Sequence, residues 1–414
     1  MKKLFEKWNS ISLIFRILGG IILGVIIALI ARLLDISKYT NWVGIFGTLF
    51  TGALKALAPI LVFVLVLSSI SNAKNSVGKN FTTVILLYLS TTLLASIISV
   101  CASFIFKLQI QLEGVDKITN SAPSSVAEVM KNLLLNLIAN PITSLAEGNY
   151  LGILFWSILL GIAFRKAGDT TKNFLQDMSS AVSTCVRWVI SFAPFGVLGL
   201  VYTVVSEFGL TIFVDYGLLV LLLVGCMLFV SLVINPIIAS ITIGQNAYPL
   251  LFRCLKESGI TAFFTRSSAA NIPVNMKLCE NLGLNKDSYS VSIPLGATIN
   301  MDGAAITIAI MSLVGAFSSG VEVHFWQAII LSFLATIAAC GASGVAGGSL
   351  LLIPLACSLL GVSPDIAMQM VGVGFIIGVI QDSLETALNS SGDVMFTACA
   401  EFREWKKQGK EIKF

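Results

Sequence analysis

Long apolar runs separated by short polar segments occupy most of this chain. Six runs, at residues 13–33, 43–70, 81–106, 148–165, 185–205 and 211–242, have close to or more than the ~20 residues that a helix needs to cross a bilayer core. Strands of a membrane β-barrel would instead show short alternating segments, so the pattern predicts an all-α polytopic membrane protein. The first run is long and lacks a clear cleavage site, and is interpreted as an uncleaved span.

Four later apolar segments are interrupted. Segments 290–318 and 366–400 contain polar and glycine clusters. Segments 246–275 and 326–360 each carry an interruption near the middle, which is serine-rich in the first (residues 265–273) and glycine-rich in the second (residues 340–349). The apolar pieces beside each interruption have about 12–18 residues, too few to cross a core of ~30 Å reliably. Each segment is therefore expected to form a re-entrant helix–tip–helix hairpin. Two interrupted segments in corresponding positions indicate a transporter site built from inverted repeats.

Composition and charge support a membrane protein with both termini in the cytoplasm. Apolar residues make up 56% of the chain and charged residues 12%, about half the charged share of a soluble domain. Lys and Arg gather at both ends and between apolar runs, where they report orientation rather than nucleic-acid binding. Charge fits ten spans as well as eight spans plus two hairpins, and length and tip composition favour eight plus two. Residues 107–147 are expected to form an outer loop with an amphipathic stretch at 125–137.

Cysteine and histidine chemistry has little support. None of the eight cysteines forms a CxxC or Cys/His metal spacing, and they are interpreted as small packing residues. His324 is the only histidine, which disfavours a Ser-His-Asp triad. Asp302 and Asp393 could pair as in an intramembrane aspartyl protease, but Asp393 follows Ser390-Ser391-Gly392 rather than completing a GxGD tetrad. The two hairpins also favour a transporter, and the chain is not expected to be an enzyme.

The last interrupted segment carries a row of polar residues, which we call the polar stripe. At about 100° per residue its members fall within an arc of about 100° on one helix, and they are Asp382, Glu385, Thr386, Asn389 and Asp393. An ionised residue near the bilayer centre costs roughly 2.5–3.5 kcal/mol, a cost tolerated where the group binds something. An ion or substrate site is therefore favoured, with a purely structural polar network as the alternative.

A second polar cluster, Asn300-Met301-Asp302-Gly303, interrupts segment 290–318. Asn and Gly weaken a helix, so local unwinding that frees backbone carbonyls is expected here. Carbonyls with one carboxylate suit Na⁺, whereas Ca²⁺ would need more carboxylate and Mg²⁺ would keep its waters. A proton relay through Asp and Glu is the alternative for the coupling ion.

The two interruptions are candidate hairpin tips. Ser267 and Ser268 precede a short helix whose N–H groups and positive dipole end suit a substrate carboxylate, with a plain helix cap as the alternative. Arg266 could contact the substrate or neutralise a carboxylate of the polar stripe, and the second role is favoured because an Arg at membrane depth needs an anion. The second tip contains Gly341, Gly344, Gly347 and Gly348, which favour a mobile gate, with close helix packing as the alternative.

At these motifs the chain resembles the sodium:dicarboxylate (glutamate/aspartate–sodium) symporter family over nearly its whole length. The resemblance implies a homotrimer in the inner membrane and an elevator mechanism, in which a transport domain slides past a scaffold. The implied division is 1–80 for scaffold helices 1–2, 81–106 for transport-domain helix 3, 107–210 for the outer loop and scaffold helices 4–5, 211–403 for the transport domain (helix 6, hairpin 1 at about 246–275, helix 7, hairpin 2 at about 326–360, helix 8) and 404–414 for a cytoplasmic tail.

The resemblance also implies roles for individual residues. A first sodium set comprises Gly296, Asn300, Asn389 and Asp393; a second comprises Tyr88, Thr91, Thr92, Asn300 and Asp302; a third comprises Thr298 and carbonyls of the second tip. Asp382 resembles the holder of the substrate ammonium, with Thr386 beside it. The implied contacts to the substrate carboxylate or backbone are Ser267, Ser268, Val345 and Asn389.

Departures from the family pattern bear on the substrate. Members that carry acidic amino acids have Arg where Glu385 stands, and a Glu would repel an anionic side chain. Other departures are Ala304 for Thr, Ala269-Ala270 in the serine run and Ala346 for Pro. The expected function is therefore sodium-coupled import of small neutral amino acids, serine and threonine, whose hydroxyl could donate to Glu385. Pairing of Glu385 with Arg266 stays open, and a sodium- or proton-coupled carrier of acidic amino acids or dicarboxylates is the alternative.

Overall fold

The structure, a computed structural model, describes residues 11, 13–72, 79–112, 135, 138–147, 149–342 and 347–412. Within these ranges the chain is helical and contains no strand, which confirms the predicted all-α class. Most of the amphipathic stretch predicted at 125–137 lies outside the described residues, as do residues 343–346 of the second tip, including Val345.

Helices follow one another in two groups along the sequence. The first group comprises α2 (Leu13–Leu33), α3 (Ser37–Thr40), η1 (Asn41–Val43), α4 (Gly44–Ser71), α5 (Lys79–Phe106), α7 (Pro141–Glu147), α8 (Tyr150–Phe164), α9 (Asp169–Ser191) and α10 (Ala193–Phe208). The second comprises η2 (Gly209–Thr211), α11 (Ile212–Phe229), η3 (Val230–Ile234), α12 (Asn235–Ile243), α13 (Tyr248–Cys254), η4 (Leu255–Gly259), α14 (Ile260–Thr265), α15 (Ser268–Asn281), α16 (Lys286–Ile299), α17 (Asp302–Ser318), α18 (Phe325–Ala339), η5 (Ser349–Leu352), α19 (Ile353–Leu360) and α20 (Pro364–Lys407).

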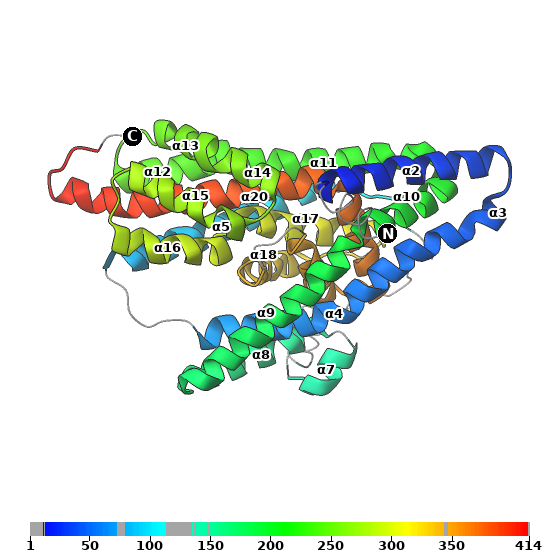
Figure 1. Cartoon of the computed structure of the whole chain (residues 1–414), viewed down its shortest axis with the longest axis horizontal. Helices are drawn as coiled ribbons and strands as arrows, with labels where there is room; N and C mark the ends of the chain where they lie inside the picture. The colour runs from blue at the N-terminus through cyan, green and yellow to red at the C-terminus, as the bar shows by residue number, and fades with distance from the viewer. Residues whose placement is uncertain are drawn as a thin grey trace.

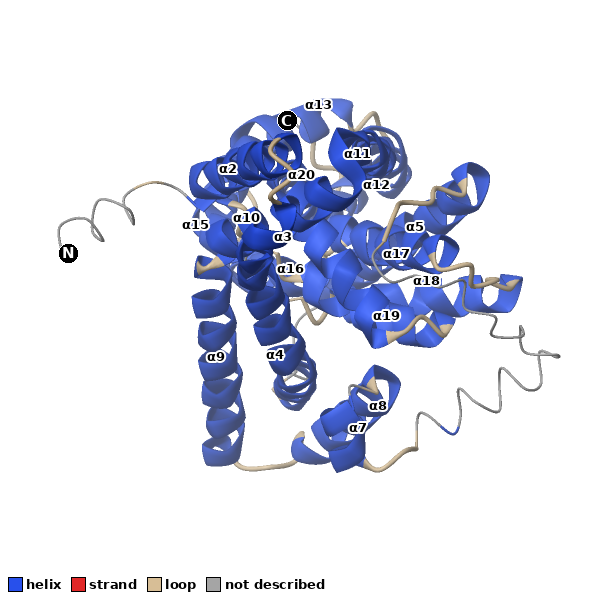
Figure 2. Cartoon of the chain, turned by 90° about the vertical axis from the view of Figure 1, so that its right-hand side faces the viewer, coloured by secondary structure: helices blue, strands red, loops and turns tan. Residues whose placement is uncertain are grey.

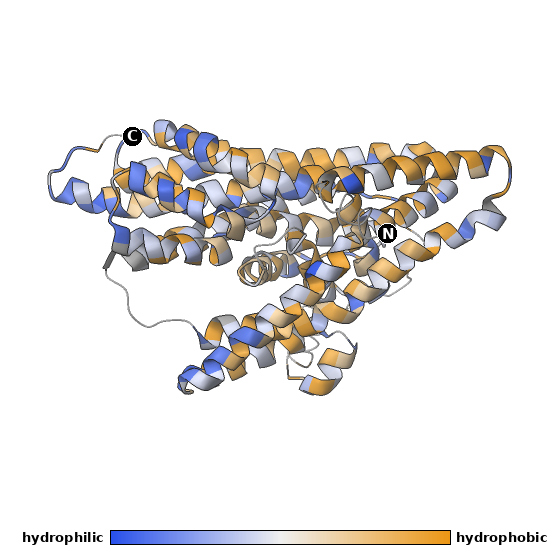
Figure 3. Ribbon diagram, in the orientation of Figure 1, coloured by the Kyte–Doolittle hydropathy of each residue, from blue (hydrophilic) through white to orange (hydrophobic). Residues whose placement is uncertain are grey.

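Six helical stretches of the described chain are long and apolar enough to cross a membrane. One of them, Ala193–Ile243, joins α10 to α11 and α12, and Gly209 with φ 76° separates the first two helices. Hydrophilic residues gather at the end of the molecule where α20 and the C-terminus lie, whereas apolar residues dominate α2 and α11 (Figure 3). These features support a polytopic membrane protein, and the count of eight spans plus two re-entrant hairpins stays a prediction.

The helices pack in two neighbourhoods. Helix α10 packs against α2 and α4, and α8 and α9 also pack against α4 (Figures 1 and 2). The remaining long helices surround α20 and α17, with α5 and α18 beside α17. Two apolar clusters fill the interior. The α20 residues of the first cluster end at Leu388, and the α20 residues of the second begin at Val394. The polar stripe therefore crosses the junction between the two clusters.

The single span predicted at 185–205 is wrong. Helix α9 ends at Ser191 and α10 begins at Ala193, followed directly by Pro194. Helix α9 buries one stripe at spacings of three and four residues, Leu175, Ser179, Ser183, Val186 and Ile190, and its remaining surface mixes charged and polar residues with exposed Phe174 and Trp188. Its polar face lowers the mean hydropathy before residue 185, so an apolar run alone misses the first half of this helix.

Both interruptions mark a junction between two helices, but the first is mostly helical: of residues 265–273, only Arg266 and Ser267 lie outside α14 and α15. At the first tip Arg266 has φ 52° and ψ 35°, a left-handed conformation that reverses the chain between α14 and α15. Ser267 Oγ then accepts a hydrogen bond from the Ala270 N–H at 3.2 Å and caps α15, so the capping interpretation of this serine is confirmed. Helix α15 continues through Pro273 to Asn281, beyond the predicted boundary at 275. The second tip separates α18 from η5 and α19.

Candidate functional site

The predicted unwinding at the second polar cluster is confirmed. Helix α16 ends at Ile299 and α17 begins at Asp302, and Met301 between them has φ −122° and ψ 49°. The break turns the Asn300 amide towards α20, where its Nδ2 donates to the Asn389 carbonyl and to Asp393 Oδ1, each at 3.0 Å. The Gly303 N–H donates to Asn389 Oδ1 at 2.7 Å. The structure therefore brings together three members of the first sodium set.

Gly296 completes the first sodium set because it leaves room for a carboxylate. A Cβ at this position would lie 2.7 Å from Asp393 Oδ1 and 2.9 Å from the Tyr88 hydroxyl. Both contacts are shorter than carbon–oxygen packing allows, so only glycine lets α16 approach α20 this closely.

The buried polar region has a surplus of acceptors. In the described residues from α12 to α20, five buried side-chain oxygens have no hydrogen-bond partner, and no buried side-chain nitrogen shares this state: the oxygens belong to Asn235, Asn271, Asn300, Gln381 and Asp393. A buried unpaired oxygen is costly, above all on a carboxylate. Bare oxygens at Asp393 and Asn300 suit a small hard cation, which needs oxygen ligands.

Residues of the second sodium set divide between two neighbours. Thr92 Oγ1 donates to Asp302 Oδ1 at 3.0 Å, and Asp302 is fully buried at the start of α17. Tyr88 lies beside the other carboxylate, where its hydroxyl donates to the Asp393 carbonyl and contacts Thr397 Oγ1, each at 2.9 Å. Thr91 Oγ1 donates to the carbonyls of Leu87 and Tyr88 in its own helix.

The third sodium set is only partly described. Thr298 is exposed and its Oγ1 donates to the Leu295 carbonyl in its own helix at 2.7 Å, so the structure does not place it among the buried residues. The Cys340 thiol, at the start of the second tip, lies 3.6 Å from the carbonyl of Ile299, the residue that follows Thr298. The carbonyls of residues 343–346 lie outside the described residues.

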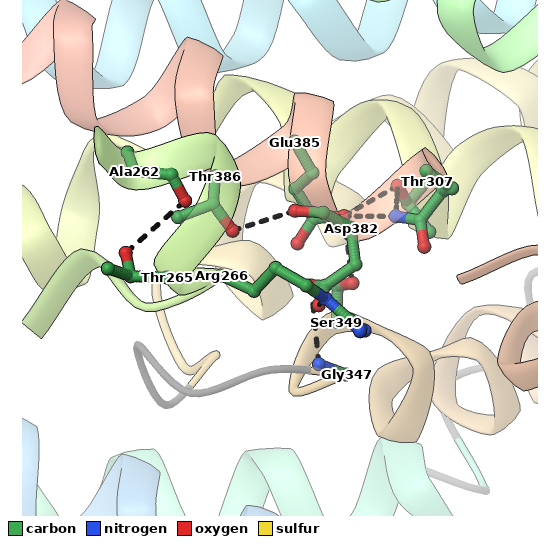
Figure 4. Close-up of polar contacts among 10 residues, drawn as sticks. Ala262, Thr265, Arg266, Thr307, Gly347, Ser349, Asp382, Glu385 and Thr386 are labelled. Carbon is green, nitrogen blue, oxygen red and sulfur yellow. Dashed lines mark hydrogen bonds and ion pairs between the residues drawn. The ribbon is translucent and has the colours of Figure 1, made fainter. Parts of the chain in front are cut away.

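Asp382 joins the two hairpin tips. Arg266 Nε donates to Asp382 Oδ2 at 2.6 Å, and the Gly347 N–H donates to Oδ1 at 3.2 Å (Figure 4). Both charged side chains are buried, so the pair is shielded from water. The predicted pairing of Arg266 with a carboxylate of the polar stripe is confirmed. Its partner is Asp382 and not Glu385, whose pairing with Arg266 was left open by the sequence.

Glu385 is held by neutral donors instead. Its Oε2 accepts hydrogen bonds from Thr307 Oγ1 at 2.7 Å and from Ser349 Oγ at 2.9 Å (Figure 4). The Gln381 side-chain amide donates to the same oxygen. These donors come from α17, from η5 beyond the second tip and from α20 itself. One carboxylate oxygen is therefore saturated and fixed in direction, while no hydrogen bond to Oε1 is found in the described part of the chain.

Two further predicted substrate residues have local roles in the structure. Thr386 Oγ1 donates to the Asp382 carbonyl at 2.7 Å within α20 (Figure 4). Ser268 is buried at the first turn of α15, next to the capping Ser267. Both lie beside the Arg266–Asp382 pair in sequence, so they border the same small region.

A polar cluster between hairpin 1 and α20 was missed by sequence reasoning. The Asn271 and Asn275 side-chain amides donate to Ser390 Oγ at 2.8 and 3.0 Å, and Ser258 Oγ donates to Asn275 Oδ1. Ser258 lies in the π-helical turn η4 and the two asparagines are one helical turn apart on α15. That spacing of two asparagines on a short helix was the available signal.

The helices, their apolar surfaces and the buried polar stripe define a polytopic helical membrane protein with a buried polar region between its helices. Residues 13–402 match the sodium:dicarboxylate symporter family, and the chain belongs to this family. The resemblance seen in the motifs is thereby confirmed, and membership indicates a transporter rather than an enzyme.

Relatives of known name cover nearly the whole chain. The serine/threonine transporter SstT of Streptococcus thermophilus is 53% identical over 407 residues, 98% of this chain and 100% of the relative. The serine/threonine transporter SstT of Bifidobacterium adolescentis is 54% identical over 408 residues, 98% of this chain and 93% of the relative. That of Streptococcus agalactiae is 53% identical over 401 residues, 97% of this chain and 98% of the relative.

Proposed function

We propose that this chain is a sodium-coupled symporter that imports serine and threonine across the inner (plasma) membrane. Membership of the sodium:dicarboxylate symporter family supports coupled transport. Similar relatives bear the name serine/threonine transporter. The environment of Glu385 carries the choice of substrate.

Glu385 favours a neutral hydroxyl amino acid over an acidic one. Three neutral donors fix its Oε2, and none of them brings a compensating positive charge. A substrate side chain that carries a carboxylate would meet this charge at low dielectric, where repulsion is strong. A serine or threonine hydroxyl can instead donate a hydrogen bond to Oε1.

The head group of the substrate fits between the two tips. The Asp382 carboxylate receives the ammonium, and to do so it must share or release its bond to Arg266 at 2.6 Å. The released guanidinium and the N-terminus of α15 at Ser267–Ser268 then lie next to the substrate carboxylate, where a positive dipole end favours an anion. Because the Gly347 N–H also bonds Asp382, binding at this carboxylate acts on the second tip, which serves as the gate.

Sodium supplies the driving force through the buried oxygens. Asp393 with Asn300 and Asn389 forms one site, Asp302 with Thr92 a second, and Thr298 with the second tip a third. One Na⁺ that enters down a potential of about 100 mV gains roughly 2.3 kcal/mol. A tenfold gradient adds about 1.4 kcal/mol, so a single ion supports a several-hundredfold accumulation of substrate.

Transport proceeds by an elevator movement in a homotrimer with cytoplasmic termini. The scaffold comprises α2, α4 and α8–α10, and the transport domain comprises α5 and α11–α20. The packing supports this division, because α10, α8 and α9 gather on α2 and α4 whereas α5 and α18 pack against α17. The hairpins α13–α15 and α18–α19 enter the membrane from opposite sides and meet at Asp382.

Uptake of labelled amino acids into proteoliposomes tests the function. Serine and threonine uptake should require an inward Na⁺ gradient and should persist when the proton gradient is collapsed. Unlabelled serine should compete, whereas a tenfold excess of aspartate should not. Uptake that ignores Na⁺ would refute the coupling, and preferential uptake of aspartate would favour the dicarboxylate alternative.

A further inference from the structure

A π-helical turn interrupts the helix between α11 and α12. Residues Val230–Ile234 form this turn, and the Asn235 N–H donates to the Val230 carbonyl five residues earlier. Such turns insert one extra residue, which advances the following side chains by about 100° around the helix axis. The turn therefore decides which way Asn235 faces.

The local geometry is maintained by compensating contacts. Pro236 has no N–H, so it leaves the carbonyl four residues earlier, that of Leu232, without its helical donor. The Tyr248 hydroxyl from α13 donates to this carbonyl at 3.0 Å. The irregular turn is thus supported by another helix rather than being a frayed end.

The turn brings Asn235 onto the second sodium set. Asn235 is 1% exposed, and its Nδ2 donates to Asp302 Oδ2 at 2.9 Å. The carboxylate accepts only, so it fixes the amide orientation and directs Asn235 Oδ1 away from itself. That Oδ1 is buried and has no partner. Thr92 holds the other oxygen of the same carboxylate.

We propose that Asn235 is a further ligand of the sodium ion held by Asp302 and Thr92, and that Oδ1 coordinates the ion. The inference rests on the proposed sodium coupling and adds a residue of α12 to the ion site. A neutral carbonyl oxygen beside one carboxylate suits a monovalent hard cation. The bond from Nδ2 to Asp302 orients the ligand, as outer contacts orient metal ligands elsewhere. In this proposal, the π-helical turn orients Asn235 so that its Oδ1 can reach the ion.

Na⁺-dependent thermal stabilisation of the purified protein tests the proposal without transport. Unfolding midpoints are measured over a series of Na⁺ concentrations, with K⁺ replacing Na⁺ at constant ionic strength. Asn235→Ala should raise about tenfold the Na⁺ concentration at which the unfolding midpoint begins to rise, the loss of roughly one polar contact. Asn235→Thr keeps a neutral oxygen at this position without a second carboxylate against Asp302, so its onset concentration should stay within about threefold of the wild type.

A control separates ligation from general packing. Asn271 in α15 is also buried with an unpaired Oδ1 but lies on Ser258 and Ser390, so Asn271→Ala should leave the Na⁺ response unchanged. If Asn235→Thr is impaired as much as Asn235→Ala, an oxygen at this position does not bind the ion and the proposal fails. A wild-type protein without any Na⁺ response would refute sodium coupling itself, whereas a responsive wild type with an unshifted Asn235→Ala refutes only the ligand.

Discussion

At the scale of single residues, three ionisable side chains set the charge of the substrate region. Arg266 and Asp382 form a buried pair at 2.6 Å, while Glu385 is surrounded by hydroxyl and amide donors. The Arg266–Asp382 pair carries no net charge, so the charge of the region is set by Glu385. In the proposed function, a zwitterionic amino acid adds an ammonium for Asp382 and leaves Glu385 to bind the side chain.

Truncation of Glu385 should reduce the preference for serine over alanine. Glu385→Ala removes the acceptor for the substrate hydroxyl, and a hydrogen bond to a charged group contributes roughly 1.5–3 kcal/mol, or about 10- to 150-fold. We expect the ratio of serine to alanine uptake to fall by at least about tenfold. The ratio is insensitive to protein amount, and an unchanged ratio would show that Glu385 does not read the side chain.

Removal of the Asp382 charge should abolish uptake. Asp382→Asn takes away the proposed ammonium partner and leaves Arg266 buried without its anion, which costs roughly 3–5 kcal/mol of folding free energy. The double variant Arg266→Gln/Asp382→Asn removes both charges, so its unfolding midpoint should recover towards wild type while serine uptake stays lost. Uptake that returns with stability would remove Asp382 as the ammonium holder.

At the scale of elements, close helix contacts and an unwound segment build the proposed ion region. The break at Asn300–Met301 separates α16 from α17, and glycines at the contacts allow both helices to reach α20. A Cβ at Gly303 would lie 2.7 Å from the Cα of Glu385, so α17 approaches α20 along its backbone. Side-chain positions at the site depend on these approaches.

A methyl group at Gly296 should weaken Na⁺ binding. Gly296→Ala places a Cβ 2.7 Å from Asp393 Oδ1, which displaces the carboxylate or the helix. Overpacking of this kind costs about 1–3 kcal/mol, so the half-maximal Na⁺ concentration for uptake should rise about tenfold or more. Gly225→Ala in α11 is the matched control, since nothing lies within 4 Å of its added Cβ. Equal behaviour of the two variants would contradict the role of Gly296.

Sequence patterns predicted some elements well and missed others for physical reasons. The break at Asn300 and the one-sided stripe from Asp382 to Asp393 followed from helix propensity and periodicity, which are local properties. Asn235 was missed because a π-helical turn changes the helical phase, so a regular period assigns its side chain to the wrong face. The partner of Arg266 also depended on tertiary packing, since two carboxylates of α20 lie within one turn.

At the scale of the whole molecule, the described residues include a charged contact and a cavity between the proposed scaffold and transport domain. Lys55 of α4 contacts Asp365 at the start of α20 at 2.8 Å, and both side chains are largely exposed. A cavity of about 340 Å³ beside them is lined by residues of α4, α10 and α20, including Thr51, Leu200 and Gln369. An exposed ion pair contributes only about 0–1 kcal/mol, so its loss would oppose the proposed sliding movement little.

A covalent link across this interface should stop transport. Cysteines at Lys55 and Asp365, bridged by a flexible bifunctional thiol reagent, should reduce serine uptake to background, and reduction of the link should restore it. The control pair Lys277 and Glu280, which contact each other within α15, should be cross-linked without effect. Full uptake in the linked Lys55–Asp365 protein would exclude relative movement of α4 and α20.

Helix α20 is continuous over 44 residues, from Pro364 to Lys407, in spite of the polar groups at its centre. Its length of about 66 Å exceeds the thickness of a bilayer with its head groups. No break separates its two ends, so a displacement of its centre carries its C-terminal end along. In the proposed elevator movement, a spectroscopic label on the exposed tail near Gln408 would therefore report the displacement of Asp382 and Asp393 from outside the membrane, without a substitution at either residue.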